Sequence, residues 1–158
     1  MGTVALDLDG VLGDTRALWT AWLEDAARRF HAIAELDVAA LPVDRAEAAR
    51  DLDRWADRGI GDWRSALARF AEEHAPVYLR PRSDAAAALR RLQATGTRIG
   101  IFTDAPEELA RVALAHLGAA RRVEALEAGS GARERLLARF GSDTRVVRSL
   151  DELVELAT

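Results

Sequence analysis

The sequence predicts an α/β protein in which a helical insertion follows the first strand of a parallel sheet. Three observations lead to this prediction. The chain begins with a short apolar strand that ends in aspartates, its second half alternates helical and strand patterns, and a helical stretch at residues 14–77 separates the two. Strands and helices that alternate with short connections are typical of a parallel sheet covered by helices on both faces.

Length and composition narrow the possible classes of protein. The 158 residues suit one domain with a small insertion, and the absence of cysteine excludes disulfides, thiolate metal sites and a cysteine nucleophile. A net charge of -4 disfavours nucleic-acid binding, and no apolar run approaches the roughly 20 residues that span a bilayer. Asp7 and Asp9 interrupt the apolar N-terminus where a signal peptide would need an unbroken stretch. We expect a cytoplasmic monomer or homodimer with no membrane or nucleic-acid partner.

The first half of the chain reads as one strand followed by three helices. The strand is apolar except for Asp7, and Gly10 predicts a turn directly after it. Leu18 and Trp22 begin an apolar helical stripe, and Pro42 marks a break. The next helix carries many Arg and Asp residues at spacings of three and four, which indicates a mostly solvated face. The predicted strand spans 3–8, and the helices span 14–31, 43–56 and 62–74.

The second half predicts the rest of the sheet. Its helices are expected at 83–93, 106–117, 132–140 and 151–157, and its strands at 98–103, 122–126 and 145–149. Residues 1–13 and 78–158 would then form the α/β core, and residues 14–77 a helical cap. We expect the cap above the carboxyl ends of the strands, the edge at which ligands bind in such sheets.

The most informative segment is DLDGVLGDT at residues 7–15. Two aspartates at the end of an apolar strand are costly to bury, and a carboxylate in such surroundings needs a cation or several donors to stay ionised. A divalent metal supplies that cation. Gly10 allows the backbone to bend so that Asp7 and Asp9 reach one open edge. The alternative is a strand end that carries two solvated aspartates.

This segment resembles the first motif of the haloacid dehalogenase (HAD) superfamily, in the form typical of its phosphatases. The resemblance extends to about Gly141 and implies a HAD-like Rossmannoid parallel sheet with a small helical cap, similar to phosphoglycolate-phosphatase-like members. It implies that Asp7 is the nucleophile that forms an aspartyl-phosphate, that Asp9 is the general acid/base, and that Mg2+ binds Asp7 and the backbone carbonyl of Asp9. Gly10 would contact substrate. The presence of Asp9 favours phosphoryl transfer over dehalogenation.

The strand that ends at Thr103 resembles the second motif of the family. The resemblance implies that the Thr103 hydroxyl binds a phosphoryl oxygen. Asp104 follows directly and has two interpretations. It would contact substrate, or it would cap the next helix, which carries Pro106 and Glu107 in its first turn.

The third and fourth motifs of the family are altered. The chain has no lysine, so Arg133 is the candidate for neutralising phosphate charge, the alternative being a solvent-facing arginine. No Gly-Asp pair follows the last predicted strand. Asp151 would complete the metal shell there, with Asp104 or Asp143 as further candidates, although the segment from Ser149 to Glu152 also reads as a capping box.

The insertion holds further candidate residues. All four tryptophans lie in it, and one or two of them, Trp19 and Trp63 among the candidates, would line a substrate pocket, the alternative being cap packing. Arg16, Arg58 and Arg64 would contact an anionic substrate.

These observations lead to two hypotheses about function. The first is a magnesium-dependent phosphatase that acts on a small phosphorylated metabolite. The second is a catalytically impaired HAD-like protein that binds a ligand or a partner, because the lysine and the Gly-Asp pair are missing. Phosphonate chemistry would need a cap lysine that the chain lacks.

Overall fold

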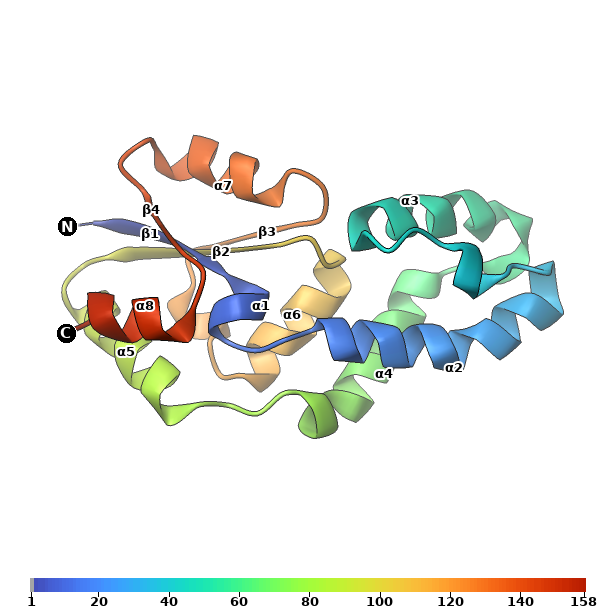
Figure 1. The fold of residues 1–158 in the computed structure, drawn as a ribbon, viewed down its shortest axis with the longest axis horizontal. Helices are drawn as coiled ribbons and strands as arrows, with labels where there is room; N and C mark the ends of the chain where they lie inside the picture. Colours follow the sequence, from blue (N-terminus) through green and yellow to red (C-terminus); the bar gives the residue numbers. More distant parts are fainter. Residues whose placement is uncertain (1) are drawn as a thin grey trace.

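A four-stranded parallel sheet forms the centre of the α/β core. The computed structural model describes residues 2–158. Its strands are β1 Thr3–Asp7, β2 Arg98–Thr103, β3 Ala125–Ala128 and β4 Arg145–Val147. Their spatial order is β3-β2-β1-β4 (Figure 1). Leu6 of β1 lies opposite Ile101 of β2 and Val147 of β4, so the first strand is an interior strand of the sheet.

Helices cover both faces of this sheet. The helices of residues 2–158 are α1 Leu8–Val11, α2 Arg16–Ala34, α3 Arg45–Trp55, α4 Trp63–Tyr78, α5 Ser83–Ala94, α6 Glu107–His116, α7 Ala132–Phe140 and α8 Leu150–Leu156. Short turns of 3-10 helix span Val38–Ala40 and Ala120–Arg122, and a π-helical turn spans Ala56–Ile60. Figure 1 shows α7 on one face of the sheet and α5, α6 and α8 on the other.

The face under α7 is closely packed. Leu136 and Phe140 of α7 pack with Ala5 and Phe102 of the sheet in a small apolar cluster. A Cβ atom at Gly100 would lie 2.7 Å from Leu136 Cδ1 and 2.8 Å from Phe140 Cε2. The absence of a side chain at this position therefore lets α7 lie directly on β2.

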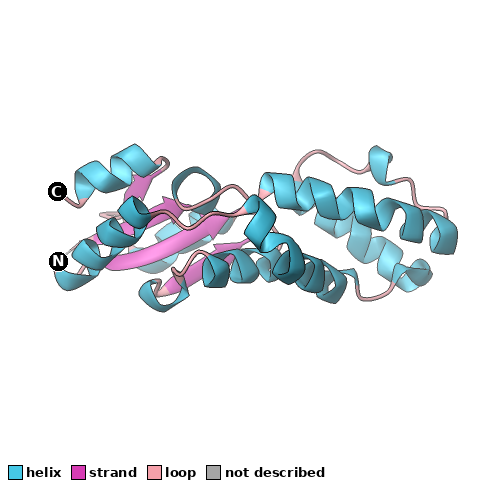
Figure 2. Cartoon of the chain, turned by 90° about the horizontal axis from the view of Figure 1, so that it is seen from below, coloured by secondary structure: helices cyan, strands magenta, loops and turns pink. Residues whose placement is uncertain are grey.

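Helices α2, α3 and α4 form the cap, beyond the carboxyl ends of β1 and β2 (Figures 1 and 2). Three tryptophan rings pack at its centre. The ring centroids of Trp19 and Trp22 lie 5.3 Å apart, and that of Trp63 lies 5.7 Å from Trp22. Helix α4 also packs on α6 of the core, and one continuous cluster of buried apolar residues extends from the sheet into the cap. Among residues 2–158, no helix has the length and apolar character needed to cross a membrane.

The predicted fold class is confirmed, with three local differences. Helix α4 runs to Tyr78, past the predicted end at residue 74, and Pro76 lies near its end, where the missing N–H costs only one bond. The third strand begins at Ala125, since the 3-10 turn Ala120–Arg122 occupies the start of the predicted range. The expected turn at Gly10 is instead the short helix α1.

Gly10 allows a close approach between α1 and the segment after β4. A Cβ atom at this position would lie 2.1 Å from the carbonyl oxygen of Arg148, so the backbone would have to move. We expect Gly10→Ala to lower the free energy of unfolding by about 1–3 kcal/mol, as overpacking commonly does. Urea unfolding measures this, with Gly2→Ala as the control because its Cβ would meet nothing within 4 Å. Equal urea midpoints for the two variants would contradict the predicted clash.

Candidate active site

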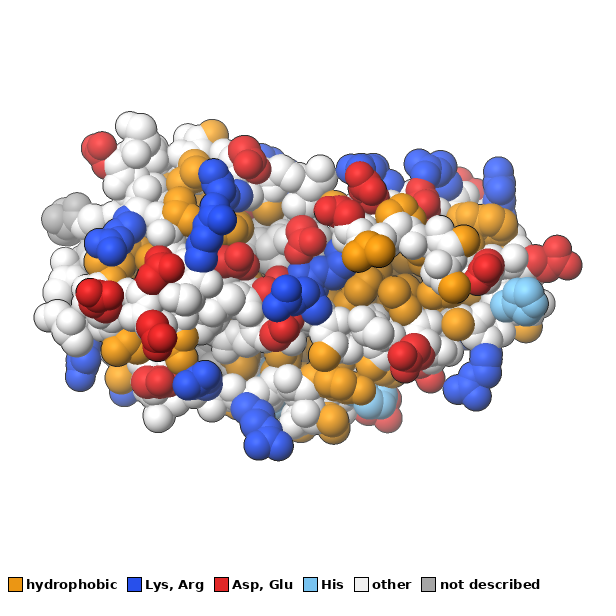
Figure 3. All heavy atoms as spheres, viewed as in Figure 1, with side chains coloured by type: hydrophobic (Ala, Val, Ile, Leu, Met, Phe, Trp, Pro, Cys, Tyr) orange, Lys and Arg blue, Asp and Glu red, His pale blue; other side chains and the backbone are white. Residues whose placement is uncertain are grey.

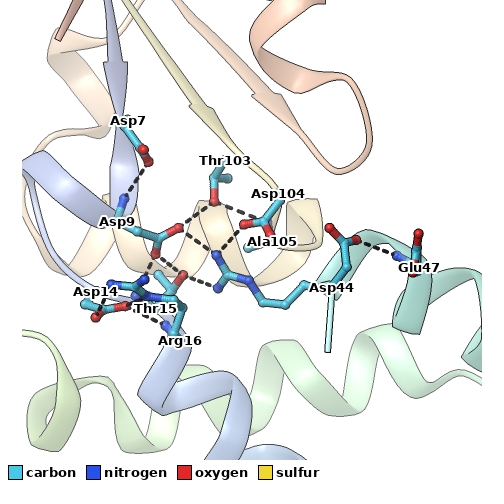
Figure 4. Close-up of polar contacts among 11 residues, drawn as sticks. Asp7, Asp9, Asp14, Thr15, Arg16, Asp44, Glu47, Thr103, Asp104 and Ala105 are labelled. Carbon is cyan, nitrogen blue, oxygen red and sulfur yellow. Dashed lines mark hydrogen bonds and ion pairs between the residues drawn. The ribbon is translucent and has the colours of Figure 1, made fainter. Parts of the chain in front are cut away.

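Three of the polar residues singled out in the sequence, Asp7, Asp9 and Thr103, meet where β1 and β2 end. Asp7 is the last residue of β1 and pairs with Phe102 of β2, which places Thr103 one residue further along the neighbouring strand. Asp9 follows Asp7 on α1, and the side chains of Asp9 and Thr103 are joined by a hydrogen bond (Figure 4). The parallel register of two adjacent strands therefore brings the first and second motifs together.

Asp7 is half-buried and lies among other carboxylates. Its Oδ1 accepts a hydrogen bond of 3.2 Å from the backbone N–H of Asp9. Burial raises the pKa of Asp7 above its ordinary value, and the charges of Asp9 and Asp104 add to this effect, while the Asp9 N–H and the charge of Arg148 oppose it. The Asp7 carboxylate is thus an incompletely neutralised anion at the sheet edge.

The Asp9 carboxylate accepts four hydrogen bonds. Its Oδ1 accepts from the Thr15 backbone N–H at 2.8 Å and from Thr15 Oγ1 at 2.5 Å. Its Oδ2 accepts from Thr103 Oγ1 at 3.0 Å and from Arg45 Nη2 at 2.6 Å. Figure 4 shows these partners converging from the core and the cap. Asp9 is therefore held in one orientation by donors on both sides of the site.

Arg45 is the functional candidate that sequence reasoning missed. It begins α3 in the cap, is 4% exposed, and binds the Thr15 hydroxyl at 2.7 Å and Asp104 Oδ1 at 2.6 Å in addition to Asp9. The interpretation of its helix as a mostly solvated face is wrong at this position. The sequence signal was limited to the helix start, where Asp44 accepts from the Glu47 N–H. Such a cap predicts where the helix begins. It does not predict that the side chain of the first helical residue is buried against the core.

Arg133 shares a pocket with Asp7. The pocket has a volume of about 250 Å³. It is lined by the loop before α7 and by Asp7, Phe102, Thr103, Asp104, Ala132, Arg133 and Glu134. Arg133 Nε is buried and, among the described residues, has no hydrogen-bond partner. A buried donor without a partner is costly, so Arg133 has unmet hydrogen-bonding capacity beside this pocket.

Asp104 and Asp151 lie in different surroundings. The helix-cap interpretation of Asp104 is wrong, because α6 starts at Glu107 with Pro106 before it, and Asp104 pairs with Arg45 instead. Asp151 is exposed in the first turn of α8, where Ser149 Oγ accepts from the Glu152 N–H at 3.1 Å. The N-terminal cap expected from the Ser149 to Glu152 pattern is thus present.

The remaining candidates make structural contacts. Trp19 and Trp63, which are 5% and 2% exposed, belong to the tryptophan cluster of the cap and do not line the Asp7 pocket. Gly10 lies against Arg148. Arg16 is exposed and donates hydrogen bonds to the Asp14 carboxylate, and this contact lowers the pKa of Asp14. Figure 3 shows such acidic and basic side chains next to one another where core and cap meet.

The oxygen atoms at this edge suit Mg2+, which prefers hard oxygen ligands and often takes one or two carboxylates together with phosphate and water. A divalent cation beside Asp7 would offset the negative charge that raises the pKa of this carboxyl. Within residues 2–158, no group of three or more His, Cys, Asp or Glu side chains is arranged to hold a metal ion. The ligands that the resemblance of residues 7–15 implies are Asp7 and the backbone carbonyl of Asp9, and Asp151 forms no such group with them.

Solved structures share this fold at low sequence identity. CbbY from Rhodobacter sphaeroides, in complex with phosphate, has a TM-score of 0.65 at 15% identity, covering 97% of this chain and 83% of that one. A HAD phosphatase from Thermococcus onnurineus has a TM-score of 0.56 at 16% identity, covering 99% and 97%. L-2-haloacid dehalogenase from Xanthobacter autotrophicus has a TM-score of 0.50 at 13% identity, covering 92% and 69%.

Sequence comparison identifies the family. A search of the curated proteins gave no match. The family model for haloacid dehalogenase-like hydrolases matches residues 1–140, which include both strand ends and the pocket with Arg133. The chain therefore belongs to the haloacid dehalogenase-like hydrolases.

Proposed function

We propose that this hydrolase is a magnesium-dependent phosphatase that acts on small phosphomonoesters through an aspartyl-phosphate. The observation that carries this proposal is the pocket that Asp7, Thr103 and Arg133 line together, with Asp9 two residues from Asp7. A nucleophilic carboxylate, an acid/base carboxylate and two anion-binding donors are what phosphoryl transfer requires. The phosphatase and the phosphate complex among the similar structures support the same chemistry.

The two aspartates would divide the reaction between them. An Asp7 carboxylate oxygen attacks phosphorus while the bond from phosphorus to the ester oxygen breaks, and protonated Asp9 gives its proton to the departing alkoxide. Asp9 then takes a proton from water as the water oxygen attacks the phosphorus of phospho-Asp7. This second step releases inorganic phosphate and restores both carboxyl groups.

The phosphoryl oxygens would be held by donors that the pocket already contains. Thr103 Oγ1, at the end of β2, donates its hydrogen to Asp9 here and would turn it to a phosphoryl oxygen once Asp9 is released. Arg133 in the first turn of α7 supplies a permanent positive charge. Mg2+, bound by Asp7 and the Asp9 carbonyl, would supply further neutralisation of the phosphoryl charge. Arg133 thereby takes the role that the missing lysine would have.

Catalysis requires that Asp9 be released from Arg45. With two donors on each of its two oxygens, the Asp9 carboxylate has no free position for a leaving group. Because Arg45 belongs to the cap and Asp9 to the core, movement of the cap would free Asp9. We infer that the arrangement in Figure 4 is a closed resting state.

Phosphate release from a panel of small phosphomonoesters, with Mg2+ and with EDTA, tests the proposed function. We expect at least one ester to be hydrolysed with Mg2+ and hydrolysis to stop with EDTA. The competing hypothesis is a binding module without turnover, and the occupation of Asp9 by Arg45 favours it. Binding of inorganic phosphate at Asp7 without hydrolysis of any ester would support that alternative and contradict the phosphatase.

Arg133→Gln should lower kcat/KM by about 10²–10³-fold, the usual effect of removing one donor that stabilises a developing oxyanion. The glutamine keeps much of the side-chain length but loses the charge. Arg139→Gln is the matched control, since Arg139 lies on the same helix, is exposed and does not line the Asp7 pocket. Equal kinetics for the two variants would show that Arg133 does not contact the phosphoryl group.

A further inference from the structure

The loop between β3 and α7 forms one wall of the Asp7 pocket. Gly129 and Gly131 of this loop line the pocket, and Arg133 follows two residues later in the first turn of α7. Both glycines have positive φ angles, 83° and 70°, which other residues rarely adopt. The Gly129 N–H donates to the backbone carbonyl of Thr103 at 2.9 Å, which ties the loop to the end of β2. The position of this loop therefore determines where Arg133 lies relative to Asp7.

Every backbone carbonyl of the loop is bound by a donor of the protein. Arg135 Nη2 donates to the Ala128 carbonyl at 2.6 Å, and Arg135 Nη1 donates to the Ser130 carbonyl. The carbonyls at positions 129 and 131 accept from backbone N–H groups of α7, those of residues 132 and 135, at 3.3 and 3.0 Å. Arg135 thus supplies three of the four donors that hold the carbonyl oxygens of residues 128–131.

Arg135 lies outside the lining of the Asp7 pocket, so it can act there only through the loop. Its side chain is 47% exposed, and its Nε donates to Glu127 Oε2 at 3.0 Å. A guanidinium group suits this arrangement because its N–H donors point in fixed directions from one plane. One side chain can therefore bind two loop carbonyls and the Glu127 carboxylate at the same time.

We propose that Arg135 is a positioning residue that fixes the loop and thereby holds Arg133 against the phosphoryl group. This inference rests on the proposed phosphatase function and adds to it the residue that orients its anion-binding arginine. Without the Arg135 side chain, the carbonyls of Ala128 and Ser130 lose their donors and are free to turn toward the pocket, where they would repel an anion. Misplacing a binding group by about 1 Å can cost on the order of 10²-fold in rate.

A double-mutant cycle with Arg133 tests this role, and inorganic phosphate is the probe. Isothermal titration calorimetry with Mg2+ measures the dissociation constant for wild type, Arg135→Ala, Arg133→Gln and the double variant. We expect Arg135→Ala to weaken phosphate binding by about 10-fold, as loss of a group that orients a ligand commonly does. When Arg133 is already glutamine, the same change should cost no more than about 2-fold, because its effect passes through Arg133. The same pattern is expected in kcat/KM for a phosphomonoester that the protein hydrolyses.

Two further variants separate the loop contacts from charge and from folding. Arg139→Ala removes an equal charge from α7, and Arg139 pairs with the same Glu127, at 3.7 Å, without bonding to a loop carbonyl among the described residues. It should keep the wild-type phosphate dissociation constant to within about 2-fold. Arg135→Lys should recover part of the loss, because the charge remains while the planar set of donors is gone. It also carries the same test if urea unfolding shows Arg135→Ala to be unstable.

The possible failures can be told apart. An equal weakening by Arg135→Ala with and without Arg133, or no weakening at all, would overturn the positioning role and leave the phosphatase proposal standing. An equal effect of Arg139→Ala would also overturn it, as an effect of net charge. Coupled loss of phosphate binding without hydrolysis of any ester would support the positioning role and contradict the phosphatase. Absence of both phosphate binding and hydrolysis would contradict the two proposals together.

Discussion

Asp7→Asn is expected to reduce phosphate release by at least about 10³-fold, because an amide cannot attack phosphorus and removing a nucleophile commonly costs that much or more. The substitution preserves the shape of the side chain and its place at the end of β1. Initial rates of phosphate release with Mg2+ measure the effect. Asp14→Asn is the matched control, since Asp14 lies nearby, is exposed and pairs with Arg16, and it should retain turnover to within a few-fold.

The stability of the same variant separates loss of chemistry from loss of fold. Burial and like charges raise the pKa of Asp7, so its ionised form is less favourable in the folded protein than in the unfolded chain. The folded state therefore loses stability as the pH rises from the usual aspartate range through the raised pKa. Because Asp7→Asn removes this loss, we expect it to be at least as stable as wild type at neutral pH without metal. Full turnover in Asp7→Asn would refute its role as nucleophile.

Arg45→Ala is expected to lower the free energy of unfolding by about 2–4 kcal/mol. Arg45 is buried and pairs with Asp9 and Asp104, and its removal leaves the Asp9 carboxylate, whose side chain is 11% exposed, without its cation. Breaking such a pair by deleting one partner is strongly destabilising, whereas Asp9 keeps its bonds from Thr15 and Thr103, which limits the loss. Denaturant unfolding followed by tryptophan fluorescence measures the change.

The matched comparison for Arg45 is Arg54→Ala on the same helix. Arg54 is 69% exposed and pairs with Asp51 across one turn, so its loss should change stability by no more than about 0.5 kcal/mol. A stability change in Arg45→Ala as small as that in Arg54→Ala would show that the contact between cap and core at Asp9 contributes little.

Much of the fold and part of the site could be predicted from the sequence because their signals are local. Asp7 and Thr103 each end an apolar strand, and the parallel register of those strands brings them to one edge. The alternation of helices and strands likewise indicated the sheet. The expected capping pattern at Ser149 depends on only four consecutive residues and is present in the structure.

The features that escaped prediction depend on contacts between distant segments. Arg45 meets Asp9 across 36 positions in the chain, and nothing near Arg45 distinguishes it from the other arginines of the cap. The role of Asp104 depends on where α6 begins and on what the cap presents to it. The sequence could not decide between the two roles considered for Trp19 and Trp63, because an apolar ring suits both a pocket wall and a helical core.

The most direct test of the covalent mechanism is mass spectrometry of the protein quenched in acid during turnover. Wild-type protein mixed with Mg2+ and a phosphomonoester that it hydrolyses is expected to carry one phosphoryl group on the peptide that contains Asp7, and Asp7→Asn should carry none. Steady release of phosphate with no phosphoryl group on that peptide, under conditions that preserve acyl phosphates, would contradict an aspartyl-phosphate at Asp7.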